Sequence, residues 1–271
     1  MPEWLARRAF LTPDAPALSF RGRWWTFADL NGAAERAAAM LLKVLSEVSA
    51  INDDDMSGPK VGPRVAVLLP NSDDFVVLVH AVAKAGAVLV PLNARLTARE
   101  MAWQLHDVGA SVLVHDDTYA DAARAVMDEL GEAAPRLVDV SWVLNTERGG
   151  VGRRGAESVS IERVAHGGSG RETFIPDFGK LRTHVALDEV HSIVYTSGTT
   201  GKPKGAMLTF GNHWWSATSS MLNLGLASGD RWLACMPPFP IGGLSILLRS
   251  VIYGIAVILH DRFDAESVNR A

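Results

Sequence analysis

The chain alternates short apolar runs with stretches of helical periodicity. Apolar runs of strand length, each bounded by turn residues, occupy 64–69, 87–90, 111–115, 136–143 and 193–195. Such runs predict buried strands. Helical periods occupy 71–85, 97–108 and 120–130. Because strands and helices alternate, we predict an α/β fold with a largely parallel sheet flanked by helices.

Apolar runs and helical periods also occur before residue 64 and after residue 195. Before residue 64 we predict a helix at 4–10 and a hairpin whose strands, 17–20 and 23–25, are joined by a turn at Arg21-Gly22. A helix should follow, from a capping box at Thr26 to Val48. After residue 195 we predict a buried strand at 206–208, a helix at 209–224, a strand at 232–235, a helix at 241–253 ended by Gly254, a strand at 256–259 and the first turns of a helix at 264–271.

Two polar segments interrupt this pattern. Residues 49–63 are acidic and contain glycine and proline, and residues 145–180 are rich in Gly, Arg, Ser and Glu. Neither has a sustained apolar period, so we predict loop insertions on the surface. The basic pair Arg153-Arg154 in the second segment is interpreted as solvated surface rather than as a ligand site.

Composition narrows the class of protein. The 271 residues are 48% hydrophobic, which is enough for a sizeable core and one or two domains. A net charge of -4 argues against bulk binding of nucleic acid or of an anionic membrane surface. The single cysteine, Cys235, excludes an internal disulfide and a cysteine-based zinc site. The first residues lack a long apolar core and the most apolar stretches contain charges, so we expect a cytoplasmic protein without integral membrane association.

The segment 195–205, between two predicted strands, has the composition of a loop that binds polyphosphate. Its glycines let the backbone approach a ligand closely, and its hydroxyl and backbone N–H groups can donate to phosphate oxygens. Lys202 and Lys204 add positive charge. The spacing differs from a Walker A loop, which needs four residues between its first glycine and Gly-Lys. The alternative is a polar surface hairpin without a ligand.

The unbroken run from Tyr195 to Gly205 resembles the phosphate-binding signature of the adenylate-forming superfamily, which comprises acyl-CoA synthetases, luciferases and adenylation domains. The segments similar to the early part of these proteins are 12–18, 25–30, 65–72 and 84–93. The resemblance implies a large N-terminal domain of stacked, mostly parallel sheets with flanking helices. It also implies that 1–271 is an incomplete AMP-binding domain without the small C-terminal domain.

One branch of the superfamily fits best. The segments 211–217, 230–237 and 242–254 are similar to those of o-succinylbenzoate–CoA ligases of menaquinone synthesis. This resemblance implies that ATP activates a carboxylate as an acyl adenylate, which then transfers its acyl group to coenzyme A. For the tryptophans in these segments, Trp214, Trp215 and Trp232, ordinary core packing is the alternative.

The resemblance also implies roles for individual residues. Lys204 is the candidate catalytic residue, and Thr196 is the candidate ligand of Mg²⁺. The candidate ATP-binding residues are Thr196, Ser197, Gly198, Thr199, Thr200, Gly201, Lys202 and Lys204. The candidate substrate-pocket residues are His213, Pro240, Gly242, Gly243 and Ser245. For His213, a structural histidine with a satisfied hydrogen bond is the alternative.

This sequence departs from the superfamily in two respects. Pro240 stands where related enzymes have a histidine near the reacting carboxylate, and proline has no side-chain donor. The later segments that bind adenine, ribose and Mg²⁺, and the lysine of the C-terminal domain, do not occur in 1–271. We therefore expect weak or no activity from 1–271 alone.

Three hypotheses stay open. The chain is an o-succinylbenzoate–CoA ligase or a portion of one, a non-catalytic fragment that binds nucleotide, or an acyl-CoA synthetase for another fatty or aryl acid. An incomplete domain would leave strands and helix faces unpaired, so we expect self-association or a homo-oligomer.

Overall fold

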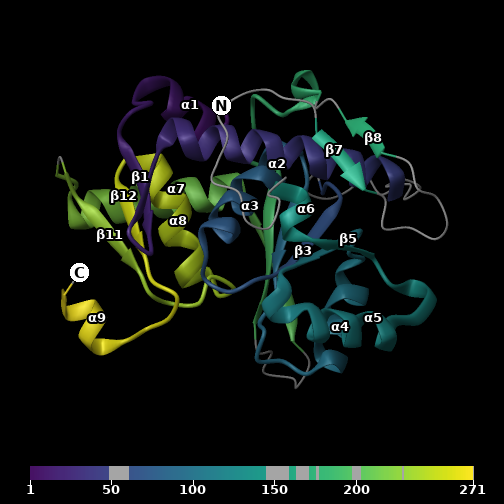
Figure 1. Cartoon of the computed structure of the whole chain (residues 1–271). Coiled ribbons are helices and arrows are strands. Elements are labelled where there is room, and N and C mark those ends of the chain that lie inside the picture. The colour runs from purple at the N-terminus through teal and green to yellow at the C-terminus, as the bar shows by residue number, and fades with distance from the viewer. Residues whose placement is uncertain are drawn as a thin grey trace.

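The computed structural model describes residues 1–48, 61–144, 159–162, 171–174, 177–196, 203–227 and 229–270. These ranges form two large sheets and a small one (Figure 1). The six-stranded sheet contains, in spatial order, β10 (Lys204–Thr209), β9 (Val190–Thr196), β4 (Val88–Pro91), β3 (Arg64–Leu68), β5 (Val112–His115) and β6 (Arg136–Asp139). The four-stranded sheet contains β11 (Arg231–Ala234), β12 (Ala256–Leu259), β1 (Pro16–Phe20) and β2 (Arg23–Thr26). The predicted α/β fold with stacked sheets is confirmed.

Helices cover both faces of the larger sheet. The described helices are α1 (Trp4–Leu11), α2 (Phe27–Val48), α3 (Asp73–Lys84), α4 (Ala98–Val108), α5 (Ala120–Leu130), α6 (Val140–Leu144), α7 (Phe210–Leu224), α8 (Ile241–Tyr253) and α9 (Ala265–Arg270). Successive side chains of a strand point to opposite faces. Val65 and Val67 of β3 accordingly belong to one core with α2 and α3, whereas Ala66 and Leu68 belong to a second core with α4 and α5. In Figure 1, α2 crosses the top of the molecule and α4 and α5 lie below on the right.

The first of these cores also covers the four-stranded sheet. Leu18 of β1 and Leu259 of β12 share it with Leu5 of α1, Phe210 of α7 and Leu247 of α8. The two sheets therefore sandwich one layer of helices. The predicted hairpin between β1 and β2 is confirmed, and its turn residues Arg21 and Gly22 both have positive φ, 49° and 79°.

Local capping fixes where several helices begin. Thr97 Oγ1 accepts from Glu100 N at 3.3 Å, and Glu100 Oε2 accepts from Thr97 N at 2.8 Å, which fixes the start of α4 within the helix predicted at 97–108. Thr209 and Asn212 form the same reciprocal pair at the start of α7. The predicted end of α8 is confirmed as well, because Gly254 follows it with a φ of 78°.

Two strand predictions need correction. The predicted strand 136–143 ends at Asp139, because Asp139 Oδ1 accepts from Ser141 N at 2.8 Å and starts the short helix α6. The strand predicted as buried at 206–208 is instead the exposed edge strand β10, in which the Met207 side chain is 50% exposed. An apolar run does not reveal whether a second strand will cover it.

The insertion predicted at 145–180 contains regular structure. Within it, β7 (Val159–Glu162) and β8 (Arg171–Phe174) pair as antiparallel strands, and a 3₁₀ turn occupies Phe178–Lys180. The sequence pattern did not predict these two strands. The pair Arg153-Arg154 and most of the insertion predicted at 49–63 lie outside the described residues.

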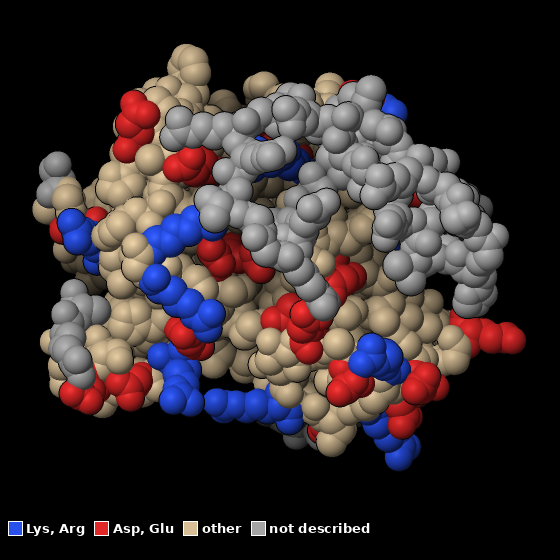
Figure 2. Space-filling view, in the orientation of Figure 1, with Lys and Arg blue, Asp and Glu red and all other residues tan. Residues whose placement is uncertain are grey.

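Charges of both signs are interspersed on the face shown in Figure 2. Among the described residues, no helix has both the length and the apolar content needed to cross a bilayer. The long helix α2 illustrates why, since its apolar positions form one stripe that faces the core.

An ion pair is buried where α1 meets α3. Lys84 Nζ lies 2.6 Å from Glu3 Oε2, and the two side chains are 2% and 3% exposed. The same carboxylate accepts from Leu5 N at 3.0 Å and Ala6 N at 2.9 Å, so it also caps α1. A second carboxylate, Glu35 of α2, lies 3.9 Å from Lys84 Nζ. One buried lysine thus fastens three helices together.

Replacing Glu3 by glutamine tests this fastening. Glu3→Gln keeps an oxygen for the α1 cap but leaves the Lys84 ammonium with only the more distant Glu35. Breaking a buried pair on one side costs about 3–5 kcal/mol, so urea unfolding should report a loss of that size. In the double variant Glu3→Gln/Lys84→Met most of the loss should disappear. The matched control is Asp121→Asn, which removes the exposed partner of Arg124 and should cost about 1 kcal/mol or less. An equal small loss in both single variants would contradict the role of the pair.

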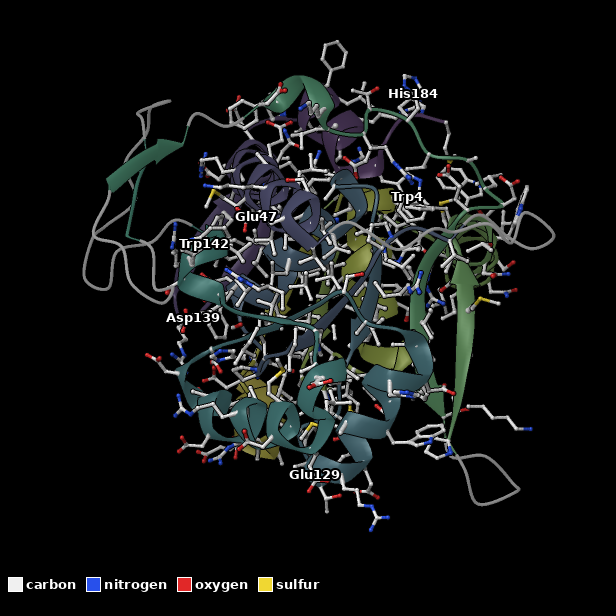
Figure 3. All side chains as sticks on the ribbon, turned by 90° about the vertical axis from the view of Figure 1, so that its right-hand side faces the viewer. Trp4, Glu47, Glu129, Asp139, Trp142 and His184 are labelled. Carbon is white, nitrogen blue, oxygen red and sulfur yellow. The ribbon has the colours of Figure 1, made fainter. Side chains whose placement is uncertain are left out.

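Three histidines are buried beside this pair. Their rings come from α3 (His80), β9 (His191) and α7 (His213). The rings of His191 and His213 lie 4.8 Å apart, and Trp4 of α1 stacks on His191 at 6.3 Å. Figure 3 shows Trp4 inside the molecule, whereas His184 lies at its outer rim. Burial lowers the pKa of both His80 and His213 to about 4, and it lowers the pKa of His191 as well.

Acid should therefore destabilise the fold. The histidines are neutral when folded but bind protons in the unfolded chain below their ordinary pKa of 6.5, so stability is lost as pH falls from 6.5 towards 4. Asp74 acts in the opposite sense, because its pKa is raised to about 6, but it is one group against three. Between pH 7 and 4.5, the free energy of unfolding of His213→Gln should fall by about 2 kcal/mol less than that of the parent, measured by urea unfolding. His184→Gln, at an exposed position, is the control and should lose as much as the parent. If His213→Gln lost as much stability as the parent, burial of a neutral His213 would not contribute to the acid sensitivity.

Candidate functional site

The carboxyl ends of strands from both large sheets meet at one edge of the molecule. Strands β9, β4, β3, β5 and β6 are parallel, and so are β11, β12 and β1. Asn71, which follows β3, donates through Nδ2 to Met236 O and to His260 O, both at 3.0 Å. Those two carbonyls follow β11 and β12. Ligands of open α/β sheets bind outside the carboxyl ends of strands, so this edge is the candidate site.

The predicted phosphate loop starts and ends at this edge. Thr196 ends β9 and Lys204 begins β10, and the two residues are direct partners in the antiparallel ladder. Thr196 Oγ1 donates weakly to Lys204 O at 3.5 Å, and both residues are exposed. Since β9 is two strands from β3, about 10 Å separates the start of the loop from the strand before Asn71. The other predicted ATP-binding residues, Ser197, Gly198, Thr199, Thr200, Gly201 and Lys202, lie outside the described residues.

Two further residues of the signature anchor the loop to the sheet. Tyr195 Oη lies 2.7 Å from Asp107 Oδ2 and 3.0 Å from Gln104 O, and burial together with Asp107 raises the pKa of Tyr195. A Cβ on Gly205 would lie 3.0 Å from Ile193 Cγ2 and 3.3 Å from the Tyr195 ring. Glycine at this position therefore lets the two strands and the tyrosine pack closely, which is a structural role.

The segment from Met236 to Gly243 is the second part of the site. Pro240 is exposed and occupies the N-cap position of α8 without a side-chain hydrogen bond to the helix. A Cβ on Gly243 would lie 2.1 Å from Pro237 O, so only glycine allows this turn to fold against α8. Gly242 is exposed, and its carbonyl accepts from Ser245 Oγ at 3.0 Å. The structure thus brings together four of the five predicted pocket residues on one turn and the helix that follows it.

His213, the fifth predicted pocket residue, lies elsewhere. Its Nε2 is 3.1 Å from Ser192 Oγ, and Ser192 precedes Thr196 by about 13 Å along β9. Its charged neighbour on α8 is Arg249, which lies about 13 Å along the helix from Pro240. The alternative reading of His213 as a satisfied core histidine accounts for this position.

Two residues of this edge were not predicted as site residues. Asn71 entered the prediction only as the first residue of the helical period 71–85, and Asp74 was not singled out. Burial raises the pKa of Asp74 to about 6, with Asp73 and Asp116 contributing in the same direction. Strongly perturbed carboxyl groups are more frequent at functional sites than elsewhere. The feature of the sequence that could have pointed to these two residues is the polar run after the strand β3.

A cavity of about 400 Å³ opens beside this edge. Its size falls within the range of small-molecule sites. It is lined by Ser19, Phe20, Arg21, Gly22, Ile258, Leu259, His260, Asp261, Arg262, Asp264 and Ser267. None of the predicted pocket residues is among them. Over the described ranges, no group of three or more His, Cys, Asp and Glu side chains is arranged to hold a metal ion.

Known relatives cover the whole chain. A 2-succinylbenzoate–CoA ligase from Bacillus cereus is 36% identical over 271 residues, which is 100% of this chain and 45% of the relative. A second one, from another strain of B. cereus, is 35% identical and is covered to 46% of its length. The chain thus spans about half the length of the curated relatives it matches.

Solved structures agree with these relatives. o-Succinylbenzoate CoA synthetase (MenE) from Bacillus subtilis, in complex with the acyl-adenylate intermediate OSB-AMP, superposes with a TM-score of 0.76 at 34% identity. The comparison covers 100% of this chain and 58% of that one. The same enzyme in complex with ATP and magnesium ion gives 0.75 at 32% identity, with 100% and 60% covered. The AMP-binding enzyme family matches residues 5–271. The resemblance seen in the sequence is therefore confirmed, and the chain belongs to the AMP-binding enzyme family.

Proposed function

We propose that this chain forms the phosphate-binding part of an ATP-dependent carboxylate–CoA ligase that acts on o-succinylbenzoate in menaquinone biosynthesis. The observation that carries the proposal is the position of the loop signature. Its two ends, Thr196 and Lys204, lie at the edge where the carboxyl ends of the strands meet. The names of the relatives supply the substrate, since they act on or bind o-succinylbenzoate derivatives.

The proposed reaction has two steps. A carboxylate oxygen attacks the α-phosphorus of ATP, an acyl adenylate forms and pyrophosphate leaves. The thiol of coenzyme A, after losing its proton, then attacks the acyl carbon and AMP leaves with the electron pair of the broken C–O bond. Both steps need negative charge on phosphate oxygens to be stabilised by fixed donors.

The described ends of the loop suit that task. The Thr196 hydroxyl is exposed at the carboxyl end of β9, where it can bind a phosphate oxygen or Mg²⁺. Lys204 is exposed beside it and adds a cation that can reach the same phosphates. Mg²⁺ would supply further positive charge to the triphosphate. The proposed ligands of ATP in the loop itself are Ser197, Gly198, Thr199, Thr200, Gly201 and Lys202.

Pro240 favours a second candidate function, a nucleotide-binding protein that does not turn over. Its ring is exposed at the N-cap of α8, and it offers neither an N–H nor a side-chain donor to a carboxylate. A ligase for another fatty or aryl acid is the third candidate. A cytoplasmic location and self-association also stay predictions; exposed apolar side chains such as Leu222 and Trp215 of α7 favour self-association.

Exchange of labelled pyrophosphate into ATP tests the ligase proposal. Any exchange that 1–271 shows with Mg²⁺ and o-succinylbenzoate, expected to be weak, should depend on the acid and should fall to background in Lys204→Ala, because a cation that offsets developing phosphate charge is lost. Lys180→Ala removes another exposed lysine and is the matched control, with the parent rate expected.

The possible results separate the candidates. Exchange with benzoate or a fatty acid but not with o-succinylbenzoate would favour another acyl-CoA synthetase. ATP binding by calorimetry without any exchange would favour the non-catalytic candidate.

Introducing the histidine of related enzymes tests the contribution of Pro240. Pro240→His should raise the exchange rate about tenfold or more, equivalent to about 1.4 kcal/mol of barrier, by adding a donor beside the carboxylate. Pro240→Asn serves as the control, since it also restores the backbone N–H and offers a good helix cap. Equal rates in both variants would assign any gain to the backbone rather than to the imidazole.

A further inference from the structure

The side chain of Asn71 joins three strand ends that are far apart in the sequence. It is 7% exposed and follows β3 of the six-stranded sheet. Its two contacts, Met236 O and His260 O, follow β11 and β12 of the four-stranded sheet. We infer that Asn71 is a positioning residue that holds the segment Met236–Gly243 at the carboxylate-activating site. This inference rests on the proposed function.

The segment needs such an external hold. Three of its residues, Pro237, Pro238 and Pro240, have no N–H and cannot fasten it through backbone donors. Among the described hydrogen bonds, two carbonyl oxygens of the segment act as acceptors at its ends. Pro240 O accepts from Gly243 N at 3.1 Å and from Leu244 N at 3.2 Å, which holds the end that joins α8. Asn71 holds the other end at Met236 O.

The chemistry of asparagine suits this position. A single amide nitrogen carries two N–H donors, and the two carbonyls at 3.0 Å each take one. An aspartate of the same shape has no donor when ionised, and it would place negative charge against two carbonyl oxygens. The bond to His260 O further connects the segment to β12 and to the wall of the 400 Å³ cavity.

Asn71 is not needed to start the helix beside it. The N-cap of α3 is Ser72, whose Oγ accepts from Phe75 N at 3.2 Å. Ser72 therefore caps α3, whereas the neighbouring Asn71 links the strand ends of the two sheets. This separation offers a matched control, because Ser72→Ala weakens α3 without removing either bond of Asn71.

The test compares Asn71→Asp with Ser72→Ala in the same 271-residue chain. The first readout is the Kd for a stable sulfamoyl analogue of o-succinylbenzoyl adenylate, by calorimetry. Asn71→Asp should bind at least tenfold more weakly at pH 8. The loss should shrink as pH falls to 6, because a carboxyl raised in pKa by the two carbonyls regains one donor on protonation. Ser72→Ala should stay within twofold of the parent at both pH values, although it unfolds at lower urea.

Deuterium uptake supplies a second readout that needs no ligand. Peptides covering 233–247 should exchange faster in Asn71→Asp than in the parent, and at the parent rate in Ser72→Ala. Uptake equal to that of Ser72→Ala, or analogue binding without pH dependence, would overturn the inference. If Asn71→Asp does not fold, Asn71→Ala takes its place in the uptake comparison. A parent chain that binds no analogue would count against the proposed function, while uptake would still decide whether Asn71 holds the segment.

Discussion

The site depends on one geometric constraint, that the parallel strands of two separate sheets end at the same edge. Each sheet alone presents only its own strand ends, and the segment before Pro240 leaves the four-stranded sheet while the phosphate loop leaves the six-stranded one. The shared layer of helices fixes the distance between the sheets. The amide of Asn71 then links their strand ends directly, at 3.0 Å to each of two carbonyls. In the proposed reaction, a carboxylate and a triphosphate would meet only if this alignment holds.

The opposite ends of the same elements serve stability. Helix α3 begins at the site edge and ends at Lys84, whose ammonium is buried against Glu3. His191 lies near the amino end of β9, while Thr196 ends that strand at the site. Buried charges and neutral histidines thus gather at one edge, where they fasten α1 and α7, and exposed polar groups gather at the other. His213 belongs to the first group, which explains why its sequence position near the loop does not make it a neighbour of Pro240.

Sequence patterns predicted the fold well because the signals were local. Apolar runs, the capping boxes at Thr97 and Thr209, and the glycine after α8 each depend on neighbouring residues. The errors concern tertiary context. Exposure of β10 depends on its place at the edge of the sheet, and the stop of β6 depends on the Asp139 side chain. For the candidate site, the loop signature singled out Thr196 and Lys204, whose part in ATP binding stays a prediction. Asn71 donates to Met236 and His260, partners that no local pattern connects.

Pro240 and Asn71 both affect how the segment Met236–Gly243 is held in position. Proline removes a side-chain donor and a backbone donor from the segment, while the hydrogen bond to Met236 O and the close packing at Gly243 hold it in position. A turn held in this way is stiff, because its φ angles are restricted and its packing tolerates no Cβ. Under the proposed function, this stiffness would preserve the shape of a carboxylate site that has Pro240 where the family resemblance implies a histidine. Catalysis would then rely mainly on alignment of the carboxylate with the α-phosphorus, a contribution that can be as large as that of a single proton donor.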